Sequence, residues 1–157
     1  MRPYPEEVLR IIQGGVVAHF VPELTSNYGK AQFAFSMLLF GVAQQRMDSA
    51  VPDLIEANTA IRGLLAEASD ALASIDRDDA RAGRAAIAGL AAASNSLKLS
   101  ALRAENDALR AVLASLAPLI EPAADVEQLA PLRDVRVKVY AHLSADAKTR
   151  VVPILSA

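Results

Sequence analysis

The stretch LSALRAENDALRAVLASLAPLI, residues 99–120, is the most regular pattern in the sequence. Its apolar positions alternate steps of three and four residues, as do the a and d positions of a coiled-coil seam. One a position holds an asparagine, Asn106, whose amide needs a hydrogen-bond partner if it is buried. The seam consists of Leu99, Leu102, Asn106, Leu109, Leu113, Leu116 and Ile120. The pattern therefore predicts a long helix over residues 96–120 with one apolar edge.

The helix that faces this seam can belong to the same chain or to a second copy. An asparagine at an a position is typical of parallel two-stranded coiled coils and indicates self-association. Antiparallel bundles use the same packing within one chain, however, and three heptads are marginal on their own. The intramolecular bundle is the favoured interpretation. Under the other interpretation, a homodimer interface is formed by Leu102, Asn106, Leu109, Leu113 and Leu116.

A second stretch, FAFSMLLFGVAQQR over residues 33–46, has apolar side chains on nearly every face up to Val42. A helix that is apolar all round is typical of a protein interior. A membrane span is excluded because it needs about 20 apolar residues. We expect this segment to lie in a helix over residues 27–47, capped by Asn27, at the centre of a bundle.

Helix signals continue through the rest of the chain. Prolines and acidic residues suit first turns, and apolar residues recur at helical spacing. Residues 134–143 fit a strand or one face of a helix, and a lone strand would have no partner, so helix is favoured. The apolar tail, residues 151–157, is expected to pack on the bundle. The prediction is a single-domain, all-α antiparallel bundle of five or six helices, over residues 5–20, 27–47, 52–74, 78–93, 96–120 and 131–145.

Composition narrows the function classes. Hydrophobic residues make up 53% of the 157 residues, and cysteine is absent, so disulfides and thiolate sites are excluded. The net charge is −2 and no basic cluster is present, so no nucleic-acid partner is expected. The first ten residues lack the pattern of a secretory signal, so we expect a cytoplasmic protein without a membrane partner.

Catalytic and metal-binding patterns are not found. His19 and His142 have no acidic residue three or four positions before them, unlike the Glu-x-x-His pairs of di-metal bundles. No nucleophile motif occurs, and the pair Gly14 and Gly15 lacks the lysine of a phosphate loop. We interpret these glycines and Gly41 as sites of close helix packing. The sequence predicts no catalytic residues, no metal and no cofactor.

One candidate binding site lies where the second and third predicted helices meet. In a hairpin of these helices, Arg46 would approach Asp53, Glu56 and Asn58. The favoured interpretation is an ion-pair network that solvates the end of the bundle. The other interpretation is the mouth of a pocket for a small amphipathic ligand. This candidate site comprises Phe33, Met37, Phe40, Arg46 and Asn58.

The N-terminal part resembles a known family. The residues that carry the resemblance are RPYPEEVLRIIQGGVVAHFVPEL (2–24), YGKAQFAFSMLLFGVAQQR (28–46) and VPDLIEANTAIRGLL (51–65). They form a proline-led helix, an apolar helix that ends in arginine, and a second proline-led helix. This pattern resembles a family of small bacterial helical proteins of uncharacterised function, associated with aminoglycoside-phosphotransferase-like kinases and acyl-CoA dehydrogenases. The resemblance implies an accessory protein near acyl-CoA or phosphoryl-transfer metabolism, with a protein partner there.

Two functions follow from these observations. The preferred one is a non-enzymatic accessory or protein-interaction bundle that forms a homodimer, because the chain has two extended apolar helices and no catalytic set. The alternative is a small-molecule-binding bundle with an apolar pocket for an acyl or similar ligand.

Overall fold

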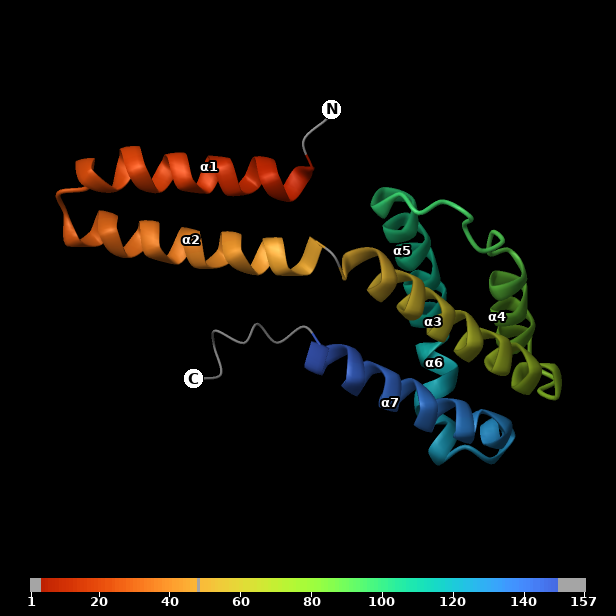
Figure 1. The fold of residues 1–157 in the computed structure, drawn as a ribbon. Coiled ribbons are helices and arrows are strands. Elements are labelled where there is room, and N and C mark those ends of the chain that lie inside the picture. The colour runs from red at the N-terminus through yellow and green to blue at the C-terminus, as the bar shows by residue number, and fades with distance from the viewer. Residues whose placement is uncertain (1–3, 48, 150–157) are drawn as a thin grey trace. The chain divides into compact units, whose positions relative to one another are not determined.

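The computed structural model describes residues 4–47 and 49–149, the last of them by its backbone alone, and over these residues it is helical without strands (Figure 1). The prediction of an all-α fold is confirmed. The described part of the chain contains seven α-helices, one more than the upper prediction, and three short 3-10 helices. The ambiguous residues 134–143 are helical, as expected. The predicted packing of residues 151–157 lies outside the described residues.

Backbone contacts divide the chain into two compact units, residues 1–51 and residues 52–157. The sequence patterns did not distinguish these units. Each is described by itself below.

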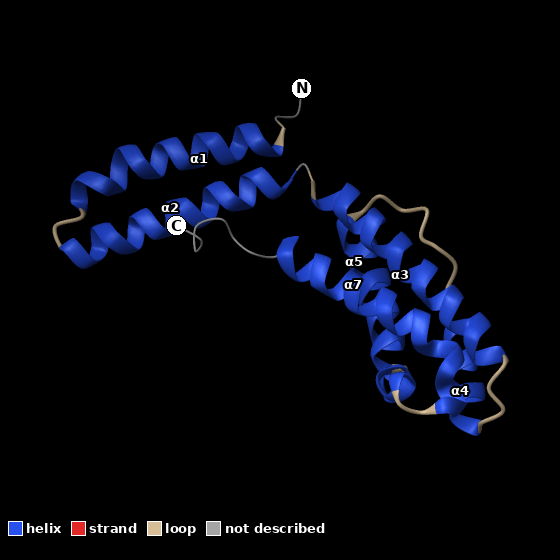
Figure 2. Ribbon diagram, turned by 90° about the horizontal axis from the view of Figure 1, so that it is seen from below, coloured by secondary structure: helices blue, strands red, loops and turns tan. Residues whose placement is uncertain are grey.

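Unit 1 is a helical hairpin. Helix α1 (Pro5–Phe20) leads through the 3-10 helix η1 (Val21–Glu23) into α2 (Asn27–Met47), which runs back beside it (Figures 1 and 2). The carboxylate of Glu7 accepts a hydrogen bond from the Tyr4 N–H at 3.1 Å, at the start of α1. At the start of α2, the Ser26 hydroxyl accepts one from the Gly29 N–H at 3.0 Å. The cap of α2 is therefore Ser26 rather than the predicted Asn27.

The expectation that this apolar helix is the most buried one is wrong. No residue of α2 is buried. Its half-buried side chains include Phe33, Met37, Phe40 and Gln44, which recur at helical spacing on one face. In unit 1 this helix has a single helical neighbour, α1, so only one of its apolar faces is covered.

Unit 2 contains the core. Its elements are α3 (Ala50–Ala73, whose first two residues belong to unit 1), α4 (Asp78–Ala88), α5 (Leu99–Ser115), α6 (Ala117–Ile120), η2 (Glu121–Ala124), η3 (Glu127–Leu132) and α7 (Arg133–Thr149). The core side chains are aliphatic, and Ile61, Leu65, Leu109 and Leu132 are almost inaccessible to solvent. Close packing extends to α4, where a Cβ atom on Gly83 would lie 2.8 Å from Leu116 Cδ2.

The heptad seam of α5 is used inside this unit. Leu109, Leu113 and Leu116 belong to the same buried cluster as the apolar face of α3. The favoured, intramolecular interpretation of the seam therefore holds. All the residues of the alternative dimer interface, Leu102, Asn106, Leu109, Leu113 and Leu116, are buried within this unit.

Two predicted helices are shorter than expected. The helix predicted over residues 78–93 ends at Ala88, and its start is held by Arg77, whose hydrogen bonds to Asp79 lower the pKa of that carboxyl below its usual range. The helix predicted over residues 96–120 is interrupted at Leu116, between α5 and α6. Pro118 explains this break, because its ring removes a backbone donor and clashes with the carbonyl four residues earlier.

Candidate functional site

A relay of hydrogen bonds crosses unit 2 and connects α3, α5 and α7. The Asn58 Nδ2 atom donates to the Leu102 carbonyl at 3.1 Å, and its Oδ1 atom accepts from Asn106 Nδ2 at 2.8 Å. The Oδ1 atom of Asn106 accepts from Arg110 Nε at 2.8 Å, and Arg110 Nη2 contacts Asp146 at 3.1 Å. Both asparagines are buried. The relay satisfies the amide of Asn106 and fixes the guanidinium of Arg110 in one orientation.

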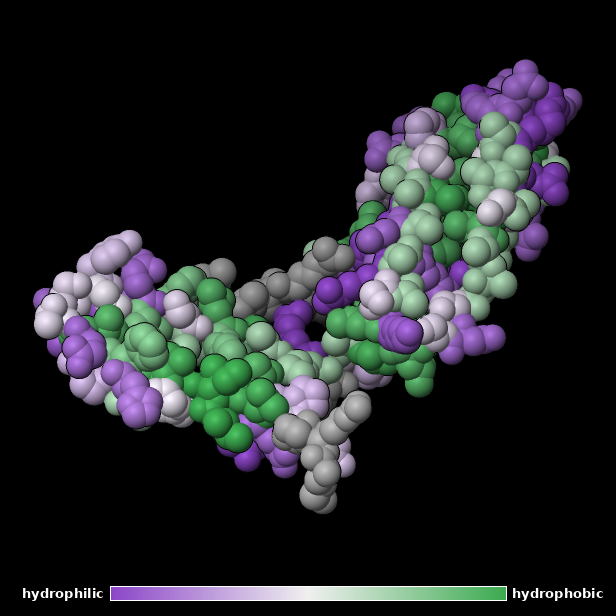
Figure 3. Space-filling view, turned by 90° about the horizontal axis from the view of Figure 1, so that it is seen from above, coloured by the Kyte–Doolittle hydropathy of each residue, from purple (hydrophilic) through white to green (hydrophobic). Residues whose placement is uncertain are grey.

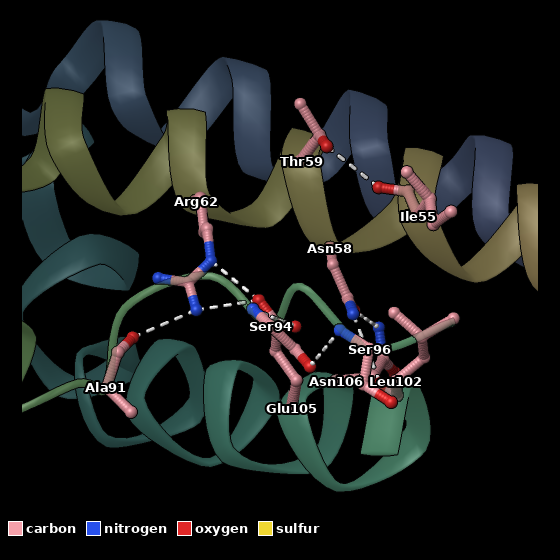
Figure 4. Close-up of polar contacts among 10 residues, drawn as sticks. All are labelled: Ile55, Asn58, Thr59, Arg62, Ala91, Ser94, Ser96, Leu102, Glu105 and Asn106. Atoms are coloured by element: carbon pink, nitrogen blue, oxygen red, sulfur yellow. Dashed lines mark hydrogen bonds and ion pairs between the residues drawn. The ribbon is translucent and has the colours of Figure 1, made fainter. Parts of the chain in front are cut away.

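A second polar group secures the loop between α4 and α5 (Figure 4). Arg62 on α3 donates to Glu105 on α5 at 2.8 Å and to the Ala91 carbonyl at 3.0 Å. The other oxygen of Glu105 accepts from the Ser94 N–H at 3.1 Å. These contacts satisfy backbone groups of residues 91–98, which are not helical, so this group has a structural role.

Unit 2 contains an apolar cleft of about 320 Å³. Its walls come from α5, α6, η2 and α7. Most of its lining is aliphatic, and the polar exceptions are Arg110, Tyr140 and Glu121. The apolar lining residues are Leu113, Ala114, Ala117, Ile120, Val139 and Leu143.

The polar rim of the cleft is held by Arg136. Its guanidinium lies over the ring of Tyr140, 4.9 Å from the centroid, and its Nε atom donates to the Glu121 carbonyl at 3.2 Å. A cation over an aromatic face is an attractive contact that restrains the ring. The cleft thus combines an apolar floor with two positioned hydrogen-bond donors, the guanidinium of Arg110 and the hydroxyl of Tyr140.

The predicted ligand site is distributed over both units. Phe33, Met37 and Phe40 lie on the half-buried face of α2, and Arg46 is exposed in its last turn. Asn58 belongs to unit 2, where its amide is engaged in the relay. Neither unit by itself brings these five residues together.

Arg110 was not singled out in the sequence analysis. The signal that could have found it is its position four residues after Asn106, which places both side chains on one face of a helix. Asp146 and Tyr140 carry no comparable signal, because they join the site only through the packing of α7.

The glycines of unit 1 do not have the predicted role. A Cβ atom on Gly14, Gly15 or Gly41 would have nothing within 4 Å. The interpretation that these residues allow α1 and α2 to pack closely is therefore wrong.

The histidines of the described chain do not form a metal site. In residues 4–47 and 49–149 no group of three or more His, Cys, Asp or Glu side chains is arranged to hold an ion. The Nε2 atom of His142 is buried without a hydrogen-bond partner among these residues. Within the same residues, no helix is both long and apolar enough for a membrane span.

Comparisons with known proteins add no relative. No protein-family model matches the chain, and neither a curated protein nor a solved structure shows significant similarity to it.

Proposed function

We propose that this protein is a non-enzymatic interaction protein that self-associates as a homodimer through the uncovered face of α2. The observation that carries the proposal is a second apolar seam on that helix, which we call the outer seam. Its members recur in steps of three and four residues, on the side opposite Phe33 and Met37. The outer seam consists of Tyr28, Ala31, Phe35, Leu38 and Val42.

Most of the outer seam is exposed in unit 1, and only Val42 among its members is half-buried. The exposed fraction is 53% for Phe35 and 43% for Leu38, and the neighbouring Leu39 is similarly accessible. Figure 3 views the hairpin from the side of α1, where apolar side chains also gather on the surface. A contiguous exposed apolar patch commonly marks an interaction site. Because α2 has apolar faces on two sides, it is suited to lie between α1 and a further helix.

A second copy of the chain fits the outer seam best. Between Ala31 and Gln45 the sequence has no charged residue, so two outer seams can meet without repulsion. The complement of a heptad seam is another heptad seam. In the described part of unit 2 the exposed large apolar residues are spread over α3, the loop before α5 and α7, and do not form one.

A membrane surface fits the outer seam less well. Helices that lie in a membrane interface are usually rich in Lys and Arg on their polar face. In α2 the basic residues are limited to Lys30 and Arg46, near its two ends. The charge pattern therefore favours a protein surface.

The cellular role that we propose follows from the family resemblance of roughly residues 3–65. The homodimer would serve as an accessory protein near acyl-CoA or phosphoryl-transfer metabolism, in the cytoplasm of a bacterium. No residue of unit 2 is assigned a catalytic step in this role.

The test is sedimentation equilibrium of the full chain over a wide concentration range. The unmodified protein should form a dimer, and L38E should weaken the dimer at least ~100-fold, because a symmetric seam would bury two carboxylates beside each other. The control is A43E, which adds the same charge to an exposed position between the two faces of α2 and should leave the dimer unchanged.

The result that contradicts the proposal is a monomer at every concentration, or equal weakening by L38E and A43E. If the unmodified chain is monomeric and L38E instead deprotects amides of unit 2 in hydrogen exchange, unit 2 covers the outer seam within one chain.

A further inference from the structure

We propose that the cleft between α5, α6 and α7 binds an amphipathic anion, with an apolar chain on the alanine floor and a carboxylate-like head at Arg110 and Tyr140. This site lies wholly within unit 2 and is distinct from the outer seam. It also differs from the ligand site expected around Phe40. The inference does not rest on self-association.

The dimensions of the cleft suit a small apolar chain. Its volume of about 320 Å³ lies at the lower end of the range for small-molecule sites. A shallower depression continues from it across Ala114, Ala117 and Glu121 to the prolines Pro118 and Pro122. The two spaces share their floor, so the apolar surface is elongated. The small side chains of Ala114 and Ala117 keep this floor open.

The head of the ligand is assigned from the donors of Arg110. A guanidinium has five N–H donors in a rigid fork, and here Nε contacts Asn106 and Nη2 contacts Asp146. The remaining donors have no partner in the described part of the chain, although 29% of the side chain is exposed and the residue lines the cleft. A fork whose direction is fixed by buried asparagines is suited to a planar carboxylate.

Tyr140 also lines the cleft and offers a second hydrogen-bond donor to a ligand bound there. Its hydroxyl has no hydrogen bond among the described residues, and its ring is restrained by Arg136. The carboxylate of Glu121 also lines the cleft, from η2, and would repel a second negative group on the ligand. The cleft should therefore select a molecule with one anionic end and an apolar remainder.

Calorimetric titration of the full chain with three probes tests the chemistry of the ligand. Decanoate should bind at least ~10-fold more tightly than decanol, because only the carboxylate can accept the two-pronged contact from Arg110. Shortening decanoate to octanoate should weaken binding about fourfold per methylene removed. Equal affinities for decanoate and decanol would overturn the assignment of the head.

Amino-acid substitutions then test whether decanoate binds in the cleft. A114F fills the floor and should abolish decanoate binding, whereas A104F, at an exposed position of the same helix outside the cleft, should bind as the unmodified chain does. Y140F removes only the hydroxyl and should weaken the binding of decanoate by about 5-fold and that of decanol less, because a hydrogen bond to a carboxylate is stronger than one to a neutral hydroxyl. Unchanged decanoate binding by folded A114F would overturn the site. If A114F does not fold, the site would be overturned by two results together: an unchanged affinity of Y140F for decanoate, and equal affinities of the unmodified chain for decanoate and decanol.

The self-association variant separates the two proposals. L38E should bind decanoate with the affinity of the unmodified chain, because Leu38 lies in unit 1. Binding that persists in L38E while the dimer is lost would support the cleft and the outer seam independently. Loss of binding in L38E would overturn the assignment to unit 2.

Discussion

Two helical glycines of unit 2 occupy opposite environments. Gly63 on α3 is exposed, and a Cβ atom there would meet nothing within 4 Å. Gly83 on α4 is buried, and a Cβ atom there would lie 2.8 Å from Leu116 Cδ2 and 3.3 Å from Leu72 Cδ1. The same substitution should therefore have opposite effects at the two positions.

We expect G63A to raise the free energy of unfolding by about 1 kcal/mol, since alanine is the better helix former and the space is open. G83A should lower it by about 1 kcal/mol, because the cost of overpacking two core leucines exceeds the gain in helix propensity. Urea denaturation monitored by circular dichroism measures both values. A G83A variant as stable as G63A would show that α4 is free to shift away from the core.

At the scale of the element, the relay fixes how α3 meets α5. N106L should reduce the free energy of unfolding by about 2 to 3 kcal/mol, because it leaves Asn58 Oδ1 and Arg110 Nε without partners. The double variant N58L/N106L should recover part of this loss, because an apolar pair leaves fewer unsatisfied groups between the helices. A double-mutant cycle in urea measures the coupling.

The control for this cycle is N106L combined with a distant change, for which G63A is suitable. The two effects should add, since Gly63 makes no contact with the relay. If N58L and N106L are also additive, the two amides do not act as a pair.

Helix positions could be predicted well because they depend on local patterns. The bounds of α1 and α2 match their predictions, since prolines, caps and apolar periodicity all lie within the segments themselves. The a and d spacing of α5 identified its buried face before any partner was known. The early end of α4 was missed, because the loop after it is held by Arg62 and Glu105, which come from other helices.

The cleft could not be predicted from local patterns. Its donors and floor come from α5, α6 and α7, which meet only after the chain turns at Pro118 and again before Arg133. The predicted burial of α2 failed for a related reason. An apolar pattern indicates that a helix face is buried against another surface. It does not identify which surface that is.

At the scale of the whole molecule, the two units should differ in how their stability depends on protein concentration. Unit 2 has a closed aliphatic core, whereas unit 1 is a hairpin without a buried residue in either helix. Hydrogen-exchange protection of α1 and α2 should therefore rise with protein concentration as the dimer forms, and protection of α3 and α5 should stay constant. In L38E the protection of α2 should be low at every concentration. Concentration-independent protection of α2 would contradict a dimer at the outer seam.

The position of Tyr140 at the rim of the cleft also has a spectroscopic consequence. The chain has no tryptophan, and Tyr140 is the only Phe, Trp or Tyr in residues 52–157. All near-ultraviolet absorption of unit 2 by aromatic rings therefore originates at the rim of the cleft. Emission from Tyr140, isolated by replacing Tyr4 and Tyr28 with phenylalanine, would report on this rim without an added label. The fluorescence of Tyr140 thus reports on the cleft, whereas all other aromatic residues of the protein lie in residues 1–51.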